Sequence, residues 1–410
     1  MASSSTPRLL DCPTEPNVVN LQQSEQDRIA ANLGFIVYFS FALSIAAFEI
    51  LDRSNPLRWL AYVVPPAGFI AAIAIGRVRV SPALALAYLF AFVFTLSCLA
   101  NLDDLQASYA ARDLVIYALL LMTLALRLPL TSWQLFLSMC CTFTLVFIFM
   151  IAHTTLSVSL HYDPDVIRGE STASIVYGAL ALFFLINRRW AFAVAALVFA
   201  VYTFKRTSYV YFVIAGGLWV MAELTIAVLG ARYRRPILVA ITSALFFACL
   251  LLSYYLLEAL SYVQQTYFPE RQLHEFTTGR SPLYEAIQNA LRRTDPIHLL
   301  FGYGPGSVEK LGLETVDIAL AHNEFYHHLY DYGVLGIVFL YAMLLALLDM
   351  RPRYYPIIFY LILVSLTDNP IYVFLIAIPI LCVFSLDIDE KASTESASVK
   401  VLGRSLPART

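Results

Sequence analysis

Long apolar runs alternate with short polar segments along most of the chain. Twelve runs are candidates to cross a bilayer as helices, which need about 20 mostly apolar residues, or fewer where the membrane thins. They cover residues 33–50, 57–75, 82–100, 113–127, 134–152, 172–187, 190–204, 208–229, 236–257, 333–348, 354–367 and 370–386. Because the runs are continuous rather than alternating, they favour helices over a barrel. The pattern predicts an all-α, polytopic membrane bundle of about 12 transmembrane helices.

The basic residues of the short loops indicate how this bundle is oriented. If the N-terminus is cytoplasmic, ten of these residues lie inside and five outside. Cytoplasmic loops are enriched in Lys and Arg, so both termini are predicted to be cytoplasmic. The chain then divides into a tail (1–32), helices 1–9 (33–257), a periplasmic loop (258–332), helices 10–12 (333–386) and a second tail (387–410).

The composition supports a membrane protein and excludes several other classes. Apolar residues make up 60% of the 410 residues and charged residues only 14%, which is too few charges to cover a water-facing surface of this size. The net charge of −2 gives no basic surface for nucleic acid. The six cysteines show neither zinc-ligand spacing nor a disulfide framework. No cofactor is predicted.

The predicted loop 258–332 concentrates the polar residues. A loop of this length is usually functional or disordered, and the helical pattern of Ser281–Leu291 predicts that this one is folded. It contains ten acidic and five basic residues, which gives a net charge of −5. Chemistry is therefore expected on the outer face.

The loop contains a glycine cluster formed by Gly302, Gly304 and Gly306. The cluster lacks the Lys-Ser/Thr of a phosphate-binding P-loop. Two interpretations remain open. The glycines form a tight turn, or they allow backbone amides to approach an anion or a sugar closely.

Four basic residues are candidates for chemistry. Lys205 and Arg206 lie on the side that the positive-inside rule depletes, with no acid next to them, so they indicate a site or interfacial snorkelling. Arg280 precedes a predicted helix and could clamp a phosphate or pair with a nearby glutamate. His322 is a candidate general base or a capping residue. The pair His327-His328 has no ligand partner at metal-site spacing, so no metal site is predicted.

The order of these residues resembles the O-antigen ligase and O-antigen polymerase superfamily. The shared order is an arginine opening a late span, Gly-Arg in a long outer loop, a glycine cluster, and His-Asn followed by Gly eleven residues after the His. The resemblance is sharpest over Gly279–Gly336. Within that range the residues in the family's register are His322, Asn323, Leu329, Asp331, Gly333 and Gly336.

The resemblance implies a bacterial inner-membrane glycosyltransferase of the GT-C type. Such enzymes move a glycan from undecaprenyl diphosphate to a sugar hydroxyl on the periplasmic face, without a metal and with inversion. By position, Arg206 and Arg280 correspond to the family's essential arginines and His322 to its catalytic histidine. Lys205 replaces the family's usual Ser, so Lys205 and Arg206 remain alternatives for the first cation. The residues expected to contact donor or acceptor are Lys205, Gly302, Gly304, Gly306, Asn323 and Tyr326.

Three functions remain open at this stage. A negatively charged outer loop should repel the phosphates of lipid A–core, which favours a repeat-unit polymerase over a ligase. Binding of that acceptor at Arg292-Arg293 would favour the ligase. A chain-length regulator would be a further partner of a polymerase. A transporter or flippase of lipid-linked sugars would instead carry ionisable residues deep inside several spans, whereas most charges here lie at loops.

Overall fold

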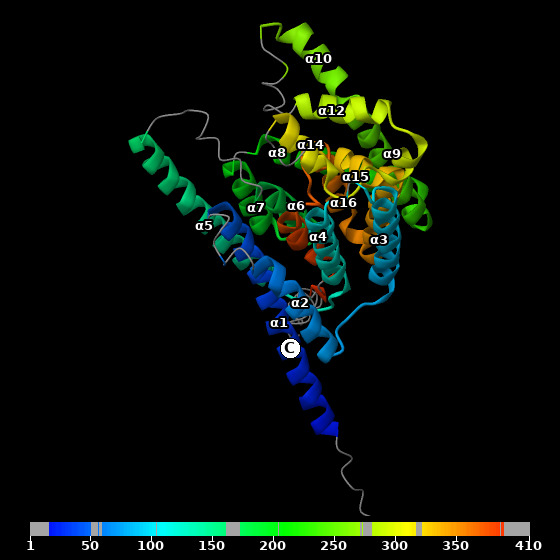
Figure 1. Cartoon of the computed structure of the whole chain (residues 1–410). Helices are drawn as coiled ribbons and strands as arrows, with labels where there is room; N and C mark the ends of the chain where they lie inside the picture. Colours follow the sequence, from blue (N-terminus) through cyan, green and yellow to red (C-terminus); the bar gives the residue numbers. More distant parts are fainter. Residues whose placement is uncertain are drawn as a thin grey trace, which may run out of the picture.

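A helix coincides with each of the twelve apolar runs in the computed structural model of the chain. The residues that the structure describes are 16–50, 56, 60–103, 105–160, 173–203, 205–270, 273, 281–316, 322–385 and 387–388. Within them, two short strands, β1 (Pro129–Leu130) and β2 (Asp387–Ile388), pair in parallel. The described architecture is otherwise helical (Figure 1).

The helices follow the chain in this order. Up to residue 254 they are α1 (Pro16–Ile50), α2 (Leu60–Ala74), α3 (Ser81–Ala100), α4 (Ala107–Ala125), α5 (Ser132–Leu160), α6 (Ala173–Ile186), α7 (Trp190–Tyr202), α8 (Arg206–Leu229), the 3-10 turn η2 (Ala231–Tyr233) and α9 (Arg234–Tyr254). Beyond it they are α10 (Leu256–Tyr267), α12 (Ser281–Arg292), α13 (Pro296–Phe301), α14 (Ser307–Val316), α15 (Glu324–Met350), η3 (Pro352–Tyr354), α16 (Tyr355–Val364) and α17 (Phe374–Ser385).

Five of the described helical segments are long and apolar enough to cross a membrane. They are Pro82–Ala100, Ala107–Ala125, Thr207–Leu229, Ala231–Tyr254 and Glu324–Met350. Shorter apolar helices of 10–17 residues occupy most of the other predicted spans. The structure therefore has the make-up of an all-α, multi-pass membrane protein, as the hydropathy pattern predicts.

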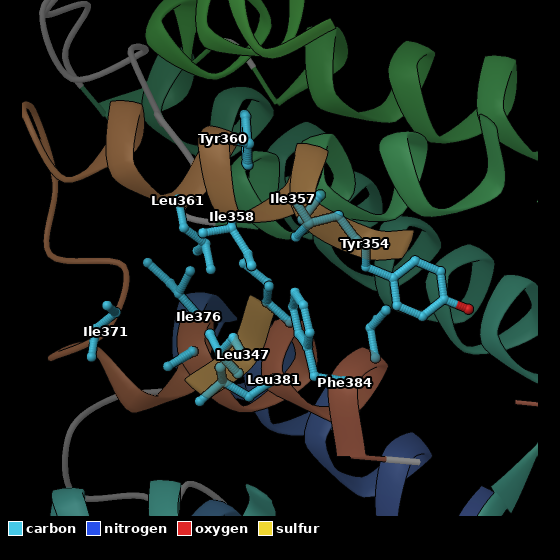
Figure 2. Close-up of a cluster of buried hydrophobic side chains, with 14 of the residues drawn as sticks. Leu347, Tyr354, Ile357, Ile358, Tyr360, Leu361, Ile371, Ile376, Leu381 and Phe384 are labelled. Carbon is cyan, nitrogen blue, oxygen red and sulfur yellow. The ribbon is translucent and has the colours of Figure 1, made fainter. Parts of the chain in front are cut away.

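The helices that are apolar on all sides lie at the centre. All ten residues of α16 are buried, and in α6 every residue but Leu185 is buried. Figure 2 shows side chains of α15, α16 and α17 packed together in this core. In contrast, α8 exposes Val213 and Val228, which suits a lipid-facing helix.

Several short helices form a cap at one end of the bundle. In Figure 1, α10, α12 and α14 lie at this end, and the start of α1 extends from the other. The cap is joined to the bundle where α13 packs against α3 and α15. There Gly333 has a φ of 64°, which kinks α15, and a Cβ at this position would lie 2.5 Å from the carbonyl carbon of Leu300. The kink coincides with the predicted boundary between the outer loop and helix 10.

Two predicted boundaries differ from the helices that form. Helix α1 begins at Pro16, so residues 16–32, predicted to be a tail, continue the first span as helix. Helix α15 begins at Glu324, before the predicted start of its span at 333. Its first turns carry charged residues, and the kink at Gly333 separates them from the apolar part that hydropathy predicts. Of the predicted tail 387–410, the structure describes only β2.

Candidate active site

A buried cluster of ionisable side chains joins three segments that are far apart in the sequence. The Nζ atom of Lys205 lies 2.6 Å from Oδ1 of Asp368, and Nδ1 of His322 lies 3.2 Å from the same oxygen. Lys205 and Asp368 are 7% and 2% exposed, whereas the side chain of His322 is 25% exposed. We call these residues the Lys–Asp–His cluster. The imidazole is the member that a substrate can reach.

The backbone places each member of this cluster. Lys205 is the N-cap of α8, with extended φ and ψ of −81° and 93°. Asp368 follows the last turn of α16, where its amide donates to the carbonyl of Val364 at 2.9 Å. His322 has a φ of 46°, in the left-handed region. Such a conformation costs a non-glycine residue about 1–3 kcal/mol and persists where its surroundings impose it.

Asn323 fixes the position of the histidine that precedes it. Its side-chain oxygen accepts from a backbone amide in the first turn of α15, so it caps this helix. Its amide nitrogen donates to the carbonyl of Leu366 at 3.0 Å and to Oγ of Ser253 at 3.2 Å. The structure thus gives Asn323, predicted to bind donor or acceptor, a capping role that aligns α15 with α9 and with the segment after α16.

Glu324 also binds the segment that follows α16 and carries Asp368. Its buried carboxylate accepts from the amides of Ile371 at 3.0 Å and Tyr372 at 3.2 Å. Its own amide donates to the carbonyl of Ser365 at 2.9 Å. The segment that carries Asp368 is therefore bound to the start of α15 before and after the aspartate, and this preorganises the cluster.

The cluster has the arrangement of a positioned general base. A carboxylate that accepts from Nδ1–H orients an imidazole and stabilises the protonated form that arises when Nε2 takes a proton. Lys205 supplies the positive charge that a buried carboxylate requires. The sequence analysis missed Asp368, although Asp368-Asn369 interrupts an otherwise apolar stretch, which is the local signal that could have identified it.

The glycine cluster binds an anion that belongs to the chain itself. The amide of Gly306 donates to Oδ2 of Asp331 at 2.9 Å, and the amide of Val308 donates to Oδ1 at 2.8 Å. The amide of Gly304 donates to the carbonyl of Asp331 at 3.1 Å. A Cβ at Gly302 would overlap the backbone of the same aspartate. These glycines make a tight turn that fastens α14 to α15, which is the first of the two interpretations from the sequence; their contact with a donor or acceptor stays a prediction.

The glycine turn and the Lys–Asp–His cluster are separate features of the described structure. Asp331 lies about two and a half turns of helix beyond His322. The three glycines contact α15, Asn101 and Tyr109 rather than the cluster. The amides of Gly304 and Gly306 donate to Asp331, whereas the amide of Gly302 donates to the carbonyl of His298, so the turn acts on the site through the position of α15.

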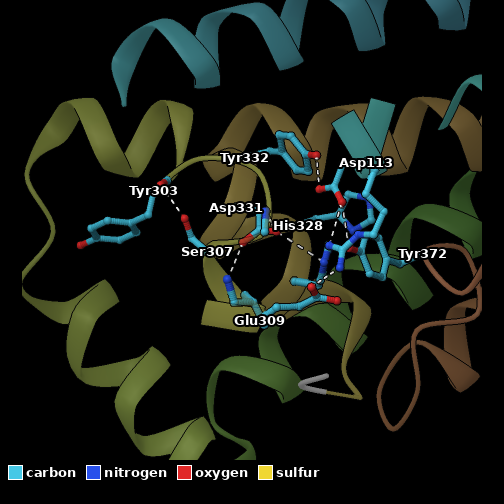
Figure 3. Close-up of polar contacts among 12 residues, drawn as sticks. Asp113, Tyr303, Ser307, Glu309, His328, Asp331, Tyr332 and Tyr372 are labelled. Atoms are coloured by element: carbon cyan, nitrogen blue, oxygen red, sulfur yellow. Dashed lines mark hydrogen bonds and ion pairs between the residues drawn. The ribbon is translucent and has the colours of Figure 1, made fainter. Parts of the chain in front are cut away.

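A second buried polar network surrounds Asp113, which the sequence analysis also missed (Figure 3). Tyr332 and Tyr372 donate to the two oxygens of its carboxylate at 2.7 and 2.8 Å. Arg112 donates to the same carboxylate at 3.0 Å and pairs with Glu309 of α14. Burial raises the pKa of Glu309, and Arg112 offsets part of this effect. The network joins α4, α14, α15 and the segment before α17.

The tyrosines of the outer segment pack against other protein groups. The hydroxyl of Tyr326, predicted to contact donor or acceptor, accepts from Nε2 of Gln288 at 2.7 Å, and its ring lies 5.4 Å from that of Tyr284. Tyr330 stacks on Tyr303 with ring centroids 4.6 Å apart. Packing is thus the observed role of both residues.

His327 and His328 face different carboxylates one turn away. Nε2 of His327 lies 3.4 Å from Asp331, and Nδ1 of His328 lies 3.2 Å from Glu324. Nε2 of His328 also lies 2.9 Å from the hydroxyl of Tyr117. Each histidine thus has one carboxylate nearby, although neither ring nitrogen of His327 forms a hydrogen bond within the described residues.

The structure describes the predicted arginines to different extents. Arg206 is the first residue of α8 and follows Lys205 directly. Arg280 precedes α12 and lies outside the described residues. Arg292, part of the proposed acceptor patch, pairs with Glu258 at 2.6 Å. Lys205 contacts the same carboxylate oxygen of Asp368 as His322 does.

Comparison of the sequence with known families and curated proteins identifies no relative. No family model matches the chain, and no curated protein matches it. The site is therefore interpreted from its own geometry and chemistry.

Proposed function

We propose that the chain is a membrane glycosyltransferase that moves a glycan from undecaprenyl diphosphate to a sugar hydroxyl. The observation that carries the proposal is the contact of Asp368 with both His322 and Lys205. It gives the predicted base a positioning carboxylate in a partly exposed site at the end of a helical bundle. This site has the parts that an inverting transfer to a hydroxyl needs.

The reaction requires one proton acceptor and one leaving group. The acceptor hydroxyl oxygen forms a bond to the anomeric carbon while the bond from that carbon to the diphosphate oxygen breaks. Nε2 of His322 takes the hydroxyl proton, and Asp368 stabilises the imidazolium that results. The bonding electrons leave with the diphosphate, so its negative charge increases. Attack opposite the leaving group inverts the anomeric carbon.

The cations of the site divide between two tasks. Lys205 is paired with Asp368, so its charge is already engaged in holding the base. This favours Arg206 as the first cation that faces the diphosphate, with Arg280 as the second. Arginine suits this task because its planar fork donates two parallel hydrogen bonds to a phosphate. The amino end of α8 adds a partial positive charge next to Arg206.

The membrane arrangement belongs to the same proposal. The twelve apolar helices would cross the bacterial inner membrane with both termini in the cytoplasm, and the segment 258–332 would face the periplasm. The contact between Asn323 and Ser253 supports this arrangement, because it ties the cluster to the end of α9 that leads into α10. On this side no nucleotide donor is available, so the lipid diphosphate provides the driving force.

A repeat-unit polymerase is the acceptor class that we favour over an O-antigen ligase. The segment from Glu258 to Asp331 has a net charge of −5, which disfavours a phosphorylated lipid A–core acceptor. The ion pair between Arg292 and Glu258 also neutralises half of the basic patch that would attract that acceptor. A chain-length regulator would be the expected partner of a polymerase.

Buried charges and the kink of α15 favour a lipid-linked-sugar transporter as the second candidate. However, the three buried carboxylates of α4 and α15 are held in place: Asp331 by two amides, Glu324 by two amides, and Asp113 by two tyrosines and Arg112. They lie in the first turns of α4 and α15, at the end near the cap. Carboxylates that are fixed at one end of a bundle fit a rigid catalytic site better than a transport pathway across the membrane.

The test is transfer by the purified full-length protein in vesicles that contain a lipid-linked oligosaccharide. The polymerase is expected to lengthen the lipid-linked glycan, whereas a ligase would modify only added rough lipopolysaccharide. His322→Ala should lower the rate by about 10²–10⁴-fold, the usual contribution of a general base. His298→Ala, at a half-buried histidine of α13, is the control and should retain activity. Unchanged turnover in His322→Ala would refute the mechanism.

A further inference from the structure

An apolar groove runs along the outer half of the bundle between α9 and α15. Its volume is about 580 Å³. One wall comes from α9 and the other from α15. The residues that line it include Phe247, Leu250 and Leu251 on α9, and Leu329, Val334 and Val338 on α15. On α15 the groove extends from Phe325 to Val338, which corresponds to about 20 Å of helix.

The groove is open along its length and closed at its inner end. Phe247 and Leu251 are 53% and 60% exposed, and Val334 and Val338 are 40% and 45% exposed. At the inner end the rings of Phe247 and Tyr341 lie 5.6 Å apart, and Tyr341 is hydrogen-bonded to α9. Both helices are long and apolar enough to span the membrane. The groove therefore opens toward lipid, and a hydrocarbon chain is the group that can fill it.

The outer end of the groove adjoins the candidate active site through residues with side-chain hydroxyls. Ser253, Tyr254 and Tyr326 line it there. Oγ of Ser253 accepts from Asn323, the residue that follows His322. A molecule with its chain in the groove would therefore place its headgroup beside the Lys–Asp–His cluster and the amino end of α8. A polyprenyl diphosphate has this arrangement, because an apolar chain is joined to an anionic headgroup.

We infer that this groove holds the polyisoprenoid chain of the lipid-linked donor and thereby sets the position of its diphosphate. The inference rests on the proposed function, because it takes the donor to be a polyprenyl diphosphate. Binding of the remote chain would position the reacting carbon, in the way that non-reacting parts of a substrate do in other enzymes. The donor's chain length should then affect its affinity.

The first experiment maps the chain directly. Undecaprenyl diphosphate with a diazirine in its isoprenoid chain is photolysed with the full-length protein in vesicles of phosphatidylethanolamine and phosphatidylglycerol. Labelled peptides are expected to contain Phe247–Tyr254 and Phe325–Val338. Unlabelled undecaprenyl diphosphate should compete, and extra phosphatidylglycerol should not. Equal competition by phosphatidylglycerol would show an ordinary lipid groove and overturn the inference.

The second experiment fills the groove. Val338→Trp and Leu251→Trp change exposed residues on opposite walls, so the core is left intact. Each is expected to lower photolabelling and raise the KM for an undecaprenyl donor about tenfold, with kcat unchanged and with little effect on a geranyl donor. Leu84→Trp is the matched control, because Leu84 lines a comparable apolar groove between α3 and α4 at the other end of the bundle. Equal effects of all three variants would overturn the inference.

The two proposals fail in different ways. Labelling of the groove without transfer by the wild-type protein would refute the enzyme and leave a polyprenyl-diphosphate site. Transfer with labelling at the α3–α4 groove, or with no dependence on chain length, would refute the groove and leave the enzyme.

Discussion

The carboxylate of Asp368 shares one oxygen between the ammonium of Lys205 and the imidazole of His322. Because the aspartate is 2% exposed, its charge must be compensated within the protein. Removing one partner from a buried ion pair typically costs about 3–5 kcal/mol, since the other charge is left uncompensated. The three residues are therefore expected to act as a unit, with effects that do not add.

Replacing Asp368 should separate its positioning role from folding. Asp368→Asn keeps the shape but removes the charge beside the imidazole, so transfer should fall about 10²-fold or more. The neutral imidazole is then favoured, and the acid limb of the pH–rate profile should move to lower pH. A purely structural role would lower the amount of folded protein without moving this limb.

The matched control removes another carboxylate partner of a basic residue. Asp349→Asn breaks the exposed pair with Arg235 at the far end of α15, where N and O lie 3.1 Å apart. This variant should retain both activity and pH profile. A similar loss in both variants would contradict the specific role of Asp368.

Glu309 gives a prediction on stability and pH. Burial raises the pKa of its carboxyl above the ordinary value of 4.5, so the folded protein holds this proton more tightly than the unfolded chain. Stability contributed by the protonated form is therefore lost as the pH rises above 4.5. Glu309→Gln should remove this component, so the wild-type protein should lose stability relative to the variant as the pH increases. Thermal unfolding in detergent at several pH values measures this, and parallel curves would contradict it.

At the scale of elements, α15 connects the cap to the bundle of apolar helices. Its first turns carry Glu324, His327, His328 and Asp331, all fully buried, and its later turns are apolar. The glycine turn binds Asp331, so it fixes the helix between these two parts. The hydropathy pattern predicts the apolar part of α15 well. It misses the polar turns because their burial depends on partners in α4, α14 and the segment before α17.

The glycine turn can be tested by comparing two glycines that share a backbone conformation. Gly306 and Gly76 have φ of 76° and 68°. Among the described residues, a Cβ at Gly76 would meet no atom within 4 Å, whereas one at Gly306 would overlap the side chain of Tyr109. Gly76→Ala should cost about 1–2 kcal/mol from φ alone. Gly306→Ala should cost about 1–3 kcal/mol more because of overpacking.

The thermal unfolding midpoint in detergent reports both costs. Gly306→Ala should also lower transfer, because a displaced α15 moves His322. Equal losses of stability in the two variants would contradict the close contact with Tyr109.

At the scale of the whole molecule, the cap and the Lys–Asp–His cluster lie at the same end of the bundle. Helices apolar all round lie inside it, and helices with exposed valine and leucine lie outside. This sorting could be predicted from composition because a bilayer accepts exposed apolar side chains and excludes unpaired backbone. The orientation of the bundle is a prediction from the basic loops.

Cysteine labelling tests that orientation. In a variant with the native cysteines replaced, Glu285→Cys on the exposed face of α12 should react with a membrane-impermeant maleimide in intact cells. Arg232→Cys, exposed in η2 at the opposite end, should react only after permeabilisation. The reverse pattern would place the proposed active site in the cytoplasm and refute the periplasmic reaction.

The sequence by itself determined the helical class, the places of the apolar helices, the presence of helix within the segment 258–332 and the candidate residues Lys205 and His322. These follow from local hydropathy, charge and residue type, which are properties of neighbouring positions. Only the tertiary structure decided that Asp368 joins those two residues across separations of 163 and 46 positions. It also decided that the glycine turn binds Asp331 and that α9 and α15 enclose a groove. Such pairings depend on how helices pack, and packing brings together residues whose chemistry no local pattern relates.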